Sequence, residues 1–223
     1  MPDQPLQVAI VDYGLGNLYS VKHACAHVGL QAEITSSKAA IEQAQAVILP
    51  GVGAFGDAMA TLRELDLVNV LRDVAASGKP LIGICLGIQL LMTESHEFGR
   101  HQGLGIIDGP VVRFDHPIER ERALKVPQIG WNHIVSTGQA WTGTLLEGVA
   151  DRANMYFVHS YIVQPQDHSV VLATSCYGNI EFCSSLQRGN VFACQFHPER
   201  SGFEGLIVYR NLARLVRANC EGV

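Results

Sequence analysis

The sequence of 223 residues is poor in charged side chains and contains no run of basic residues. Asp, Glu, Lys and Arg together make up 17% of the chain, and the formal net charge is −5. Binding to a nucleic-acid backbone depends on clustered Lys and Arg side chains. We therefore expect no nucleic-acid partner.

Long apolar runs and targeting segments are also missing. No stretch reaches the roughly 18 consecutive apolar residues that a membrane span requires. The first residues, Met-Pro-Asp-Gln-Pro, lack the positive start and apolar stretch of a signal peptide. We expect a cytoplasmic protein with no membrane partner. Hydrophobic residues nevertheless reach 48%, so residues 1–223 are expected to form one α/β domain around a buried core.

The cysteines lack the spacing of a zinc site. They lie at positions 25, 85, 176, 183, 194 and 220, with no Cys-x-x-Cys pair, and are expected to be free thiols. His96 and His101 are five residues apart and miss a common helix face. Gly14-Leu15-Gly16 is followed by Tyr19, where a dinucleotide-binding loop needs glycine. We expect neither a metal nor a cofactor.

In the first half of the chain, short apolar runs alternate with helical patterns. Buried strands are predicted at Leu6–Val11, Ala46–Leu49 and Leu81–Ile84. Helices are predicted from about Leu18 up to Gly29, from Gly56 to Ala76, and from Ile88 to Glu94. This alternation predicts an α/β fold with an open, mostly parallel sheet and helices on both faces.

The second half has a different pattern. Residues 100–185 contain glycine-rich turns and short strand-like runs, at Pro110–Phe114, Met155–Val158 and Val170–Thr174. They predict an antiparallel or mixed sheet added to the parallel core. A last strand at Val191–Phe196 and a helix at Gly205–Arg217 complete the pattern.

Gly83-Ile84-Cys85-Leu86-Gly87 carries the clearest chemical signal. It joins a predicted strand directly to a predicted helix, which is the nucleophile-elbow pattern with cysteine in place of serine. The glycines avoid clashes on the tight turn, and the N-terminus of the helix favours thiolate. The backbone N–H of Leu86 is then placed to donate to an oxyanion. The alternative is a structural cysteine between packing glycines.

A second signal is Gln195-Phe196-His197-Pro198-Glu199, at the end of a predicted strand. Open parallel sheets gather their active sites at such strand ends. The Glu199 carboxylate can reach the His197 imidazole, fix its tautomer and stabilise the imidazolium. An ordinary surface turn is the alternative. Together with Cys85 the pair supplies nucleophile, base and orienting carboxylate, which indicates acyl transfer through a thioester.

A third segment, Pro50-Gly51-Val52-Gly53, follows another predicted strand. Glycine lets the backbone turn an amide toward a ligand, so this loop is a candidate for the second oxyanion donor. A plain strand-to-helix turn would have the same residues.

These motifs resemble those of the class I (triad) glutamine amidotransferases, which have a flavodoxin-like fold. Within that family the resemblance is closest to the glutaminase subunits of imidazole glycerol phosphate synthases, in histidine biosynthesis. Besides the elbow, it extends over residues 11–18, 50–59, 130–132, 156–161 and 195–202.

The resemblance implies a role for each matched residue. Cys85 would be the nucleophile, His197 the base and Glu199 its orienting partner, with the amides of Val52 and Leu86 as oxyanion donors. The residues that would line the glutamine pocket are Gly53, Gln89, His159, Ser160 and Tyr161.

It also implies a heterodimer with a (β/α)8-barrel cyclase subunit that receives the ammonia. Trp131, Asn132 and Tyr156 match residues near that interface, while Arg200 stands where lysine is more usual. Two alternatives remain. A glutaminase of anthranilate or aminodeoxychorismate synthesis is disfavoured by Pro50–Met59 and Tyr156–Tyr161, and a non-catalytic scaffold is disfavoured by the presence of all three triad residue types.

Overall fold

The computed structural model describes residues 6–221, with side chains up to residue 219. An eight-stranded sheet runs through the molecule in the order β11-β14-β15-β16-β4-β3-β1-β2. From β16 to β2 the strands are parallel, whereas β11, β14 and β15 extend the sheet in antiparallel fashion. This confirms the predicted sheet. Its strands are β1 (Gln7–Val11), β2 (Gln31–Thr35), β3 (Ala46–Gly51), β4 (Leu81–Cys85), β11 (Val135–Ser136), β14 (Val171–Tyr177), β15 (Ile180–Arg188) and β16 (Val191–Cys194).

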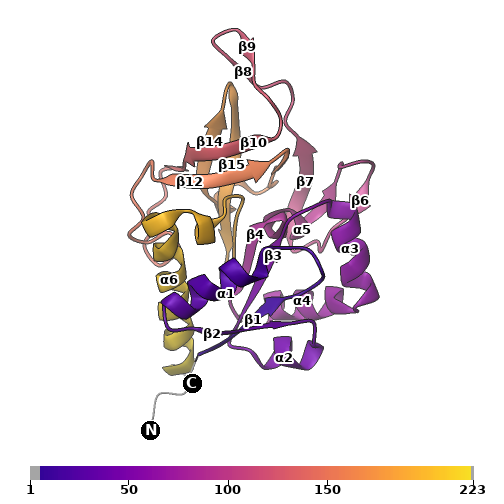
Figure 1. Cartoon of the computed structure of the whole chain (residues 1–223), viewed down its shortest axis with the longest axis vertical. Helices are drawn as coiled ribbons and strands as arrows, with labels where there is room; N and C mark the ends of the chain where they lie inside the picture. Colours follow the sequence, from indigo (N-terminus) through magenta and orange to yellow (C-terminus); the bar gives the residue numbers. More distant parts are fainter. Residues whose placement is uncertain (1–5, 222–223) are drawn as a thin grey trace.

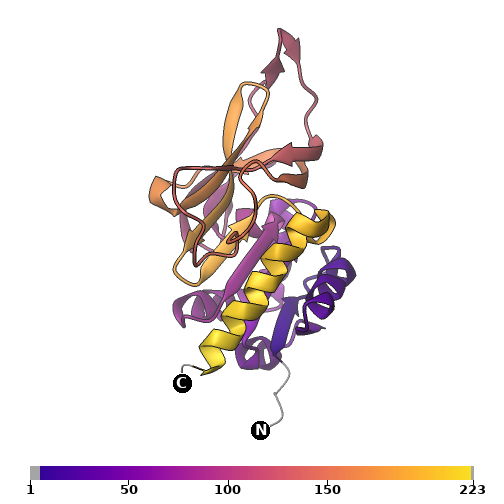
Figure 2. The same cartoon turned by 90° about the vertical axis from the view of Figure 1, so that its left-hand side faces the viewer.

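Helices cover both faces of the parallel strands (Figure 1). Val8 and Ile10 of β1 belong to a core shared with α1 and α6, whereas Ala9 and Val11 belong to a second core shared with α2, α3 and α4. Figure 2 shows α6 lying across the first of these faces. Burial on both faces explains why these strands are continuous apolar runs. The helices are α1 (Leu18–His27), α2 (Lys38–Gln43), α3 (Phe55–Glu64), α4 (Leu67–Ala76) and α6 (Gly202–Glu221).

Smaller sheets complete the fold, in the region where the sequence predicts added strands. A four-stranded sheet has the order β13-β7-β5-β6, and β10-β12 and β8-β9 are antiparallel pairs. The elements are β5 (Met92–Ser95), β6 (His101–Gln102), β7 (Ile107–Arg113), β8 (Ile118–Glu119), β9 (Arg122–Ala123), β10 (Gln128–His133), β12 (Asn154–His159), β13 (Tyr161–Val163), α5 (Leu86–Leu90) and the 3-10 turns η1 (His168–Val170) and η2 (Pro198–Arg200).

Several predicted boundaries are wrong, among them the C-terminal helix, which is α6 (Gly202–Glu221) rather than Gly205–Arg217. The helix expected over Gly56 to Ala76 is two helices, α3 and α4, separated at Asp66, whose φ of 56° is left-handed. The helix expected to run to Glu94 ends at Leu90, because the following residues pair with β6 and β7 as strand β5. The last strand ends at Cys194 rather than at Phe196. Within residues 6–221 no helix is both long and apolar enough to cross a membrane.

Candidate active site

Cys85 lies on the tight turn between β4 and α5, with φ 55° and ψ −104°. A Cβ added to Gly87 would run into the carbonyl oxygen of Leu49 on the neighbouring strand, and one added to Gly83 would lie 2.9 Å from the carbonyl carbon of Gly87. The positive φ of a non-glycine residue marks local strain. This confirms the predicted elbow, although α5 has only five residues. Any contribution from its N-terminus comes from its first free N–H groups rather than from a long dipole.

His197 follows β16 and is held from both sides. Its backbone N–H donates to the Tyr156 carbonyl at 2.9 Å, and the Ser201 hydroxyl donates to its carbonyl at 2.6 Å. The ring Nδ1 lies 2.7 Å from Glu199 Oε1, and the two side chains are 7% and 2% exposed. A carboxylate only accepts, so Nδ1 carries the hydrogen and Nε2 remains for Cys85.

Cys85 and Glu199 both affect the pKa of His197. Burial alone lowers the pKa of the imidazole, but its interactions with Cys85 and Glu199 raise it to about 10. The arrangement therefore stabilises the imidazolium form. The structure brings together the three residues that the sequence predicts as a triad.

The predicted oxyanion segment lies beside the elbow. Gly51 is directly opposite Cys85 in the β3–β4 register, and the residues that follow them, Val52 and Leu86, line the same cavity. The Tyr13 hydroxyl donates to the Pro50 carbonyl at 2.7 Å and ties down the start of the loop. Whether the amides of Val52 and Leu86 hold an oxyanion stays a prediction.

A cavity of about 260 Å³ opens in front of Cys85, a small volume that suits an amino-acid-sized ligand. Every residue predicted to line a glutamine pocket is in its wall. The lining residues are Val52, Gly53, Cys85, Leu86, Gln89, Glu97, Pro127, Val158, His159, Ser160 and Tyr161.

Two side chains at this site are absent from the sequence-based set. Glu97 lines the cavity, and its Oε2 accepts from the Phe55 N–H at 2.6 Å. Gln195 is fully buried, and its Nε2 lies 3.7 Å from Cys85 Sγ. Neither residue belongs to the Gly83–Gly87 motif. Gln195 could have been found from the sequence because it lies in the motif that contains His197. No local sequence pattern indicates that Glu97 belongs to the site.

His159 is a neutral wall of the cavity rather than a second base. Burial lowers its pKa to about 4, despite the hydrogen bond to the Tyr161 carbonyl. That bond joins Nδ1 to the carbonyl at 2.9 Å, so Nδ1 carries the hydrogen. The ring packs beside Phe114, Phe157 and Phe182.

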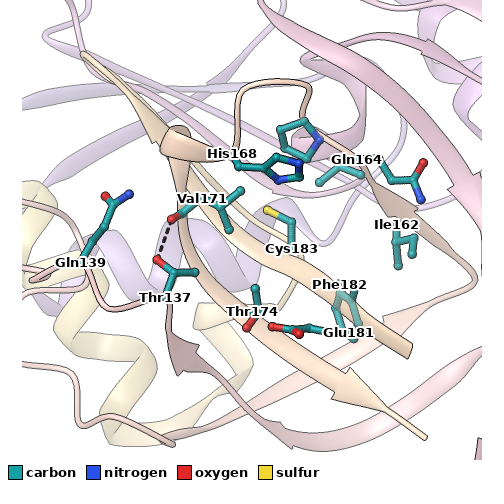
Figure 3. A pocket seen from close by; sticks show the side chains of 12 residues that line it. Thr137, Gln139, Ile162, Gln164, His168, Val171, Thr174, Glu181, Phe182 and Cys183 are labelled. Carbon is teal, nitrogen blue, oxygen red and sulfur yellow. Dashed lines mark hydrogen bonds between the residues drawn. The ribbon is translucent and has the colours of Figure 1, made fainter. Parts of the chain in front are cut away.

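A larger cavity, of about 760 Å³, lies away from Cys85 near β13, β14 and β15 (Figure 3). Its Cys183 thiol has a pKa raised to about 12 by burial, which makes it a poor nucleophile. In Figure 3 the Thr137 hydroxyl donates to the Val171 carbonyl, at 3.0 Å. The cavity contains no triad residue, so the smaller cavity is the better candidate.

Two of the three residues predicted near a partner interface, Trp131 and Tyr156, lie together beside His197. Trp131 is 59% exposed and meets the Tyr156 ring edge-on at 6.1 Å. The Arg200 guanidinium lies over the Tyr156 ring, 4.7 Å from its centroid. The third residue, Asn132, follows Trp131 in β10 and so points to the opposite face, where it donates to the Cys176 carbonyl at 2.8 Å. The Tyr156 ring is also 6.5 Å from that of His197, so this surface adjoins the predicted base.

Within the described residues, no group of three or more His, Cys, Asp or Glu side chains has a geometry suited to a metal ion. Cys25, Cys85, Cys176, Cys183 and Cys194 are free thiols, while the side chain of Cys220 lies outside the described set.

Comparisons with known proteins agree with this geometry. The profile of the family "Glutamine amidotransferase class-I" matches residues 9–206. The chain is 47% identical to the "Imidazole glycerol phosphate synthase subunit HisH" of Rhodopirellula baltica, over 92% of this chain and 96% of that protein. It is 46% identical to the HisH subunit of Moorella thermoacetica, over 94% and 95% of the two chains.

Solved structures show the same fold at lower identity. PurLQS from Thermotoga maritima aligns with a TM-score of 0.72 at 17% identity, over 96% of this chain and 100% of that one. The glutaminase domain of Trypanosoma brucei CTPS with bound acivicin aligns with a TM-score of 0.68 at 14% identity, over 96% and 94%. The chain belongs to the class-I glutamine amidotransferase family and, within it, to the HisH subunits of imidazole glycerol phosphate synthase.

Proposed function

We propose that this chain, acting as a single domain, hydrolyses glutamine to glutamate and supplies the ammonia to a cyclase subunit of imidazole glycerol phosphate synthase. The observation that carries the proposal is the buried Cys85–His197–Glu199 constellation behind an amino-acid-sized cavity. The free thiols suit a reducing compartment, so we place the protein in the cytoplasm.

The proposed reaction runs through a thioester. The Cys85 thiolate attacks the side-chain carbonyl carbon of glutamine, and the carbonyl oxygen becomes an oxyanion facing the amides of Val52 and Leu86. His197 donates a proton to the departing nitrogen, so ammonia leaves as the carbon–nitrogen bond breaks. His197 then takes a proton from water, which attacks the thioester and releases glutamate and the Cys85 thiolate.

Glu97 gives the cavity a polarity that fits this substrate. Its carboxylate lies on the wall, 9% exposed, and is the natural partner of the α-ammonium group of glutamine. Burial keeps the His159 ring neutral, so this ring adds no positive charge to the cavity wall. A substrate with a positive α-amino group and a neutral carboxamide is favoured over glutamate, whose side chain would bring a negative charge to the thiolate.

Removal of the nucleophile tests the reaction. Cys85→Ala should lower glutamate release by roughly 10⁴-fold or more, measured with the cyclase subunit and its ligand present. Cys176→Ser is the matched control, because Cys176 is an exposed thiol, and it should keep wild-type activity. Glutamate release that survives Cys85→Ala would defeat the triad assignment, and an inactive wild-type complex would favour a scaffold.

We also propose that the surface of Ile129, Trp131, Tyr156 and Arg200 docks the cyclase subunit, a (β/α)8 barrel, as a heterodimer. Ile129 and Trp131 are 63% and 59% exposed, and large exposed apolar side chains next to an active site are typical of an interface. A partner seated here would lie beside Tyr156 and His197. Ammonia released in water would become ammonium, which is not nucleophilic, so a sealed interface serves the reaction.

Titration calorimetry with the cyclase subunit tests this docking surface. Trp131→Ala should raise Kd roughly 10- to 30-fold. Phe98→Ala is the control, since Phe98 is 87% exposed on the turn between β5 and β6. Equal effects of the two variants would contradict the assignment, as would a stoichiometry other than one to one.

A further inference from the structure

Gln195 connects the catalytic sulfur to the wall of the glutamine cavity. It follows β16 directly and is fully buried, with its backbone N–H donating to the Ser184 carbonyl at 2.9 Å. Its side-chain Nε2 is 3.7 Å from Cys85 Sγ, and its Oε1 accepts from Gln89 Nε2 at 3.1 Å. Gln195 is therefore fixed at both ends of its amide.

A backbone carbonyl determines how the side-chain amides of Gln89 and Gln195 are oriented. Gln89 Nε2 also lies 3.3 Å from the Tyr161 carbonyl, which can only accept a hydrogen bond. The nitrogen of Gln89 must therefore face Tyr161 and Gln195, and the oxygen of Gln195 must face Gln89. The NH2 group of Gln195 is left for the sulfur, so Gln195 can only donate to Cys85.

This polarity distinguishes the two protonation states of Cys85. The thiol can donate to the Val158 carbonyl, 3.8 Å from Sγ, but gains little from a neighbouring NH2 group. The thiolate accepts a hydrogen bond from that group. A buried NH2 group without an acceptor would cost free energy, so the arrangement favours negative charge on the sulfur.

We propose that Gln195 is a further catalytic residue, whose carboxamide stabilises the Cys85 thiolate both before attack on glutamine and when the thioester breaks down. The catalytic role of Gln195 rests on the proposed function, because it requires that Cys85 attacks glutamine. The interaction between Gln195 and the sulfur is present without substrate, so it can be tested without measuring glutaminase activity.

The test is the rate at which iodoacetamide alkylates Cys85 as a function of pH, in the Cys176→Ser background and with Cys85 followed by peptide mass spectrometry. Gln195→Met removes the donor at similar size and should move the alkylation midpoint up by about one pH unit, which lowers the rate about tenfold at pH values below both midpoints. Gln195→Glu keeps an acceptor for Gln89 but places a negative charge near the sulfur, so it should move the midpoint further. Gln187→Met, whose amide bonds to Gly189 at the end of β15, should leave it unchanged.

The outcomes separate the two proposals. A midpoint that stays at the wild-type value in a folded Gln195→Met protein, or in Gln195→Leu if the first variant does not fold, overturns the role of Gln195. A midpoint raised in either of these neutral variants supports that role even if the wild-type complex releases no glutamate. If the wild-type complex releases glutamate but the alkylation midpoint of the Gln195 variants does not change, the proposed function stands and the role of Gln195 is refuted.

Discussion

At the residue scale, His197 is defined by its two partners. Glu199 holds Nδ1 at 2.7 Å, and both side chains are nearly closed to solvent. Because burial by itself lowers the pKa of an imidazole, the value of about 10 depends on the interactions of His197 with Cys85 and Glu199. Loss of the Glu199 charge removes both the orientation of the ring and part of the stabilisation of its protonated form.

Glu199→Gln therefore should lower glutamate release by roughly 10³-fold or more, since the amide can present a hydrogen to Nδ1 and leave the wrong tautomer toward Cys85. The His197 pKa, followed by NMR of its ring proton, should fall from about 10. Glu147→Gln is the control, because that carboxylate pairs with Arg214 at 2.8 Å on the surface. Activity of Glu199→Gln within threefold of Glu147→Gln would contradict an orienting role.

At the scale of the element, the elbow depends on how closely α5 approaches β3. The missing side chain of Gly87 leaves room for the Leu49 carbonyl. A backbone carbonyl in a central strand cannot move aside as the end of a side chain can, so added volume here must displace the turn that carries Cys85.

A pair of glycine substitutions separates crowding from helix propensity. Gly87→Ala should destabilise the fold by about 1–3 kcal/mol and lower glutaminase activity, measured by urea unfolding and glutamate release. Gly56→Ala, in α3, meets the ring of His101 at 2.9 Å. Because that ring can rotate away, this control should be neutral or gain up to about 1 kcal/mol. Equal stability of the two variants would show that close contact with β3 is not what requires glycine.

How much the sequence predicted also depends on the element. The elbow was predictable because strand, turn and glycines all lie within residues 81–87, so local patterns suffice. Strand β5 was not, because it exists through pairing with β6 and β7, and its apolar start fits a helix equally well. Glu97 reaches the cavity only through that same pairing, so its role could not be seen from its neighbours in the chain.

The helix break at Asp66 was missed for a different reason. The apolar spacing continues from α3 into α4, with Leu62, Leu67 and Val70 all buried. Periodicity records which face is buried but does not record a change of axis between two helices that share the same core.

At the scale of the whole molecule, the two buried histidines limit stability at opposite ends of the pH range. The His197 pKa is raised to about 10, so its contribution is complete below the unfolded value of about 6.5 and is lost as pH rises through 10. The His159 pKa is lowered to about 4. Its neutral form is favoured by folding, so stability is complete above about 6.5 and is lost as pH falls toward 4.

The loss of stability at low pH can be tested with a substitution outside the triad. For His159 alone, a folded pKa of about 4 implies a loss of about 2 kcal/mol between pH 7.5 and pH 5. His159→Phe keeps an aromatic ring among Phe114, Phe157 and Phe182 and removes the titrating group. Urea unfolding at the two pH values should show a correspondingly smaller loss in this variant.

His116→Gln provides the matched control, because the His116 side chain is 95% exposed and has nearly the same surroundings in the folded and unfolded chain. Its stability should fall between pH 7.5 and pH 5 as much as that of the wild type. Carboxylates and other histidines contribute to the absolute loss in all three proteins, so the decisive quantity is the difference between variants. If His159→Phe loses as much stability as His116→Gln, the burial of a neutral His159 does not set the acid limit of this fold.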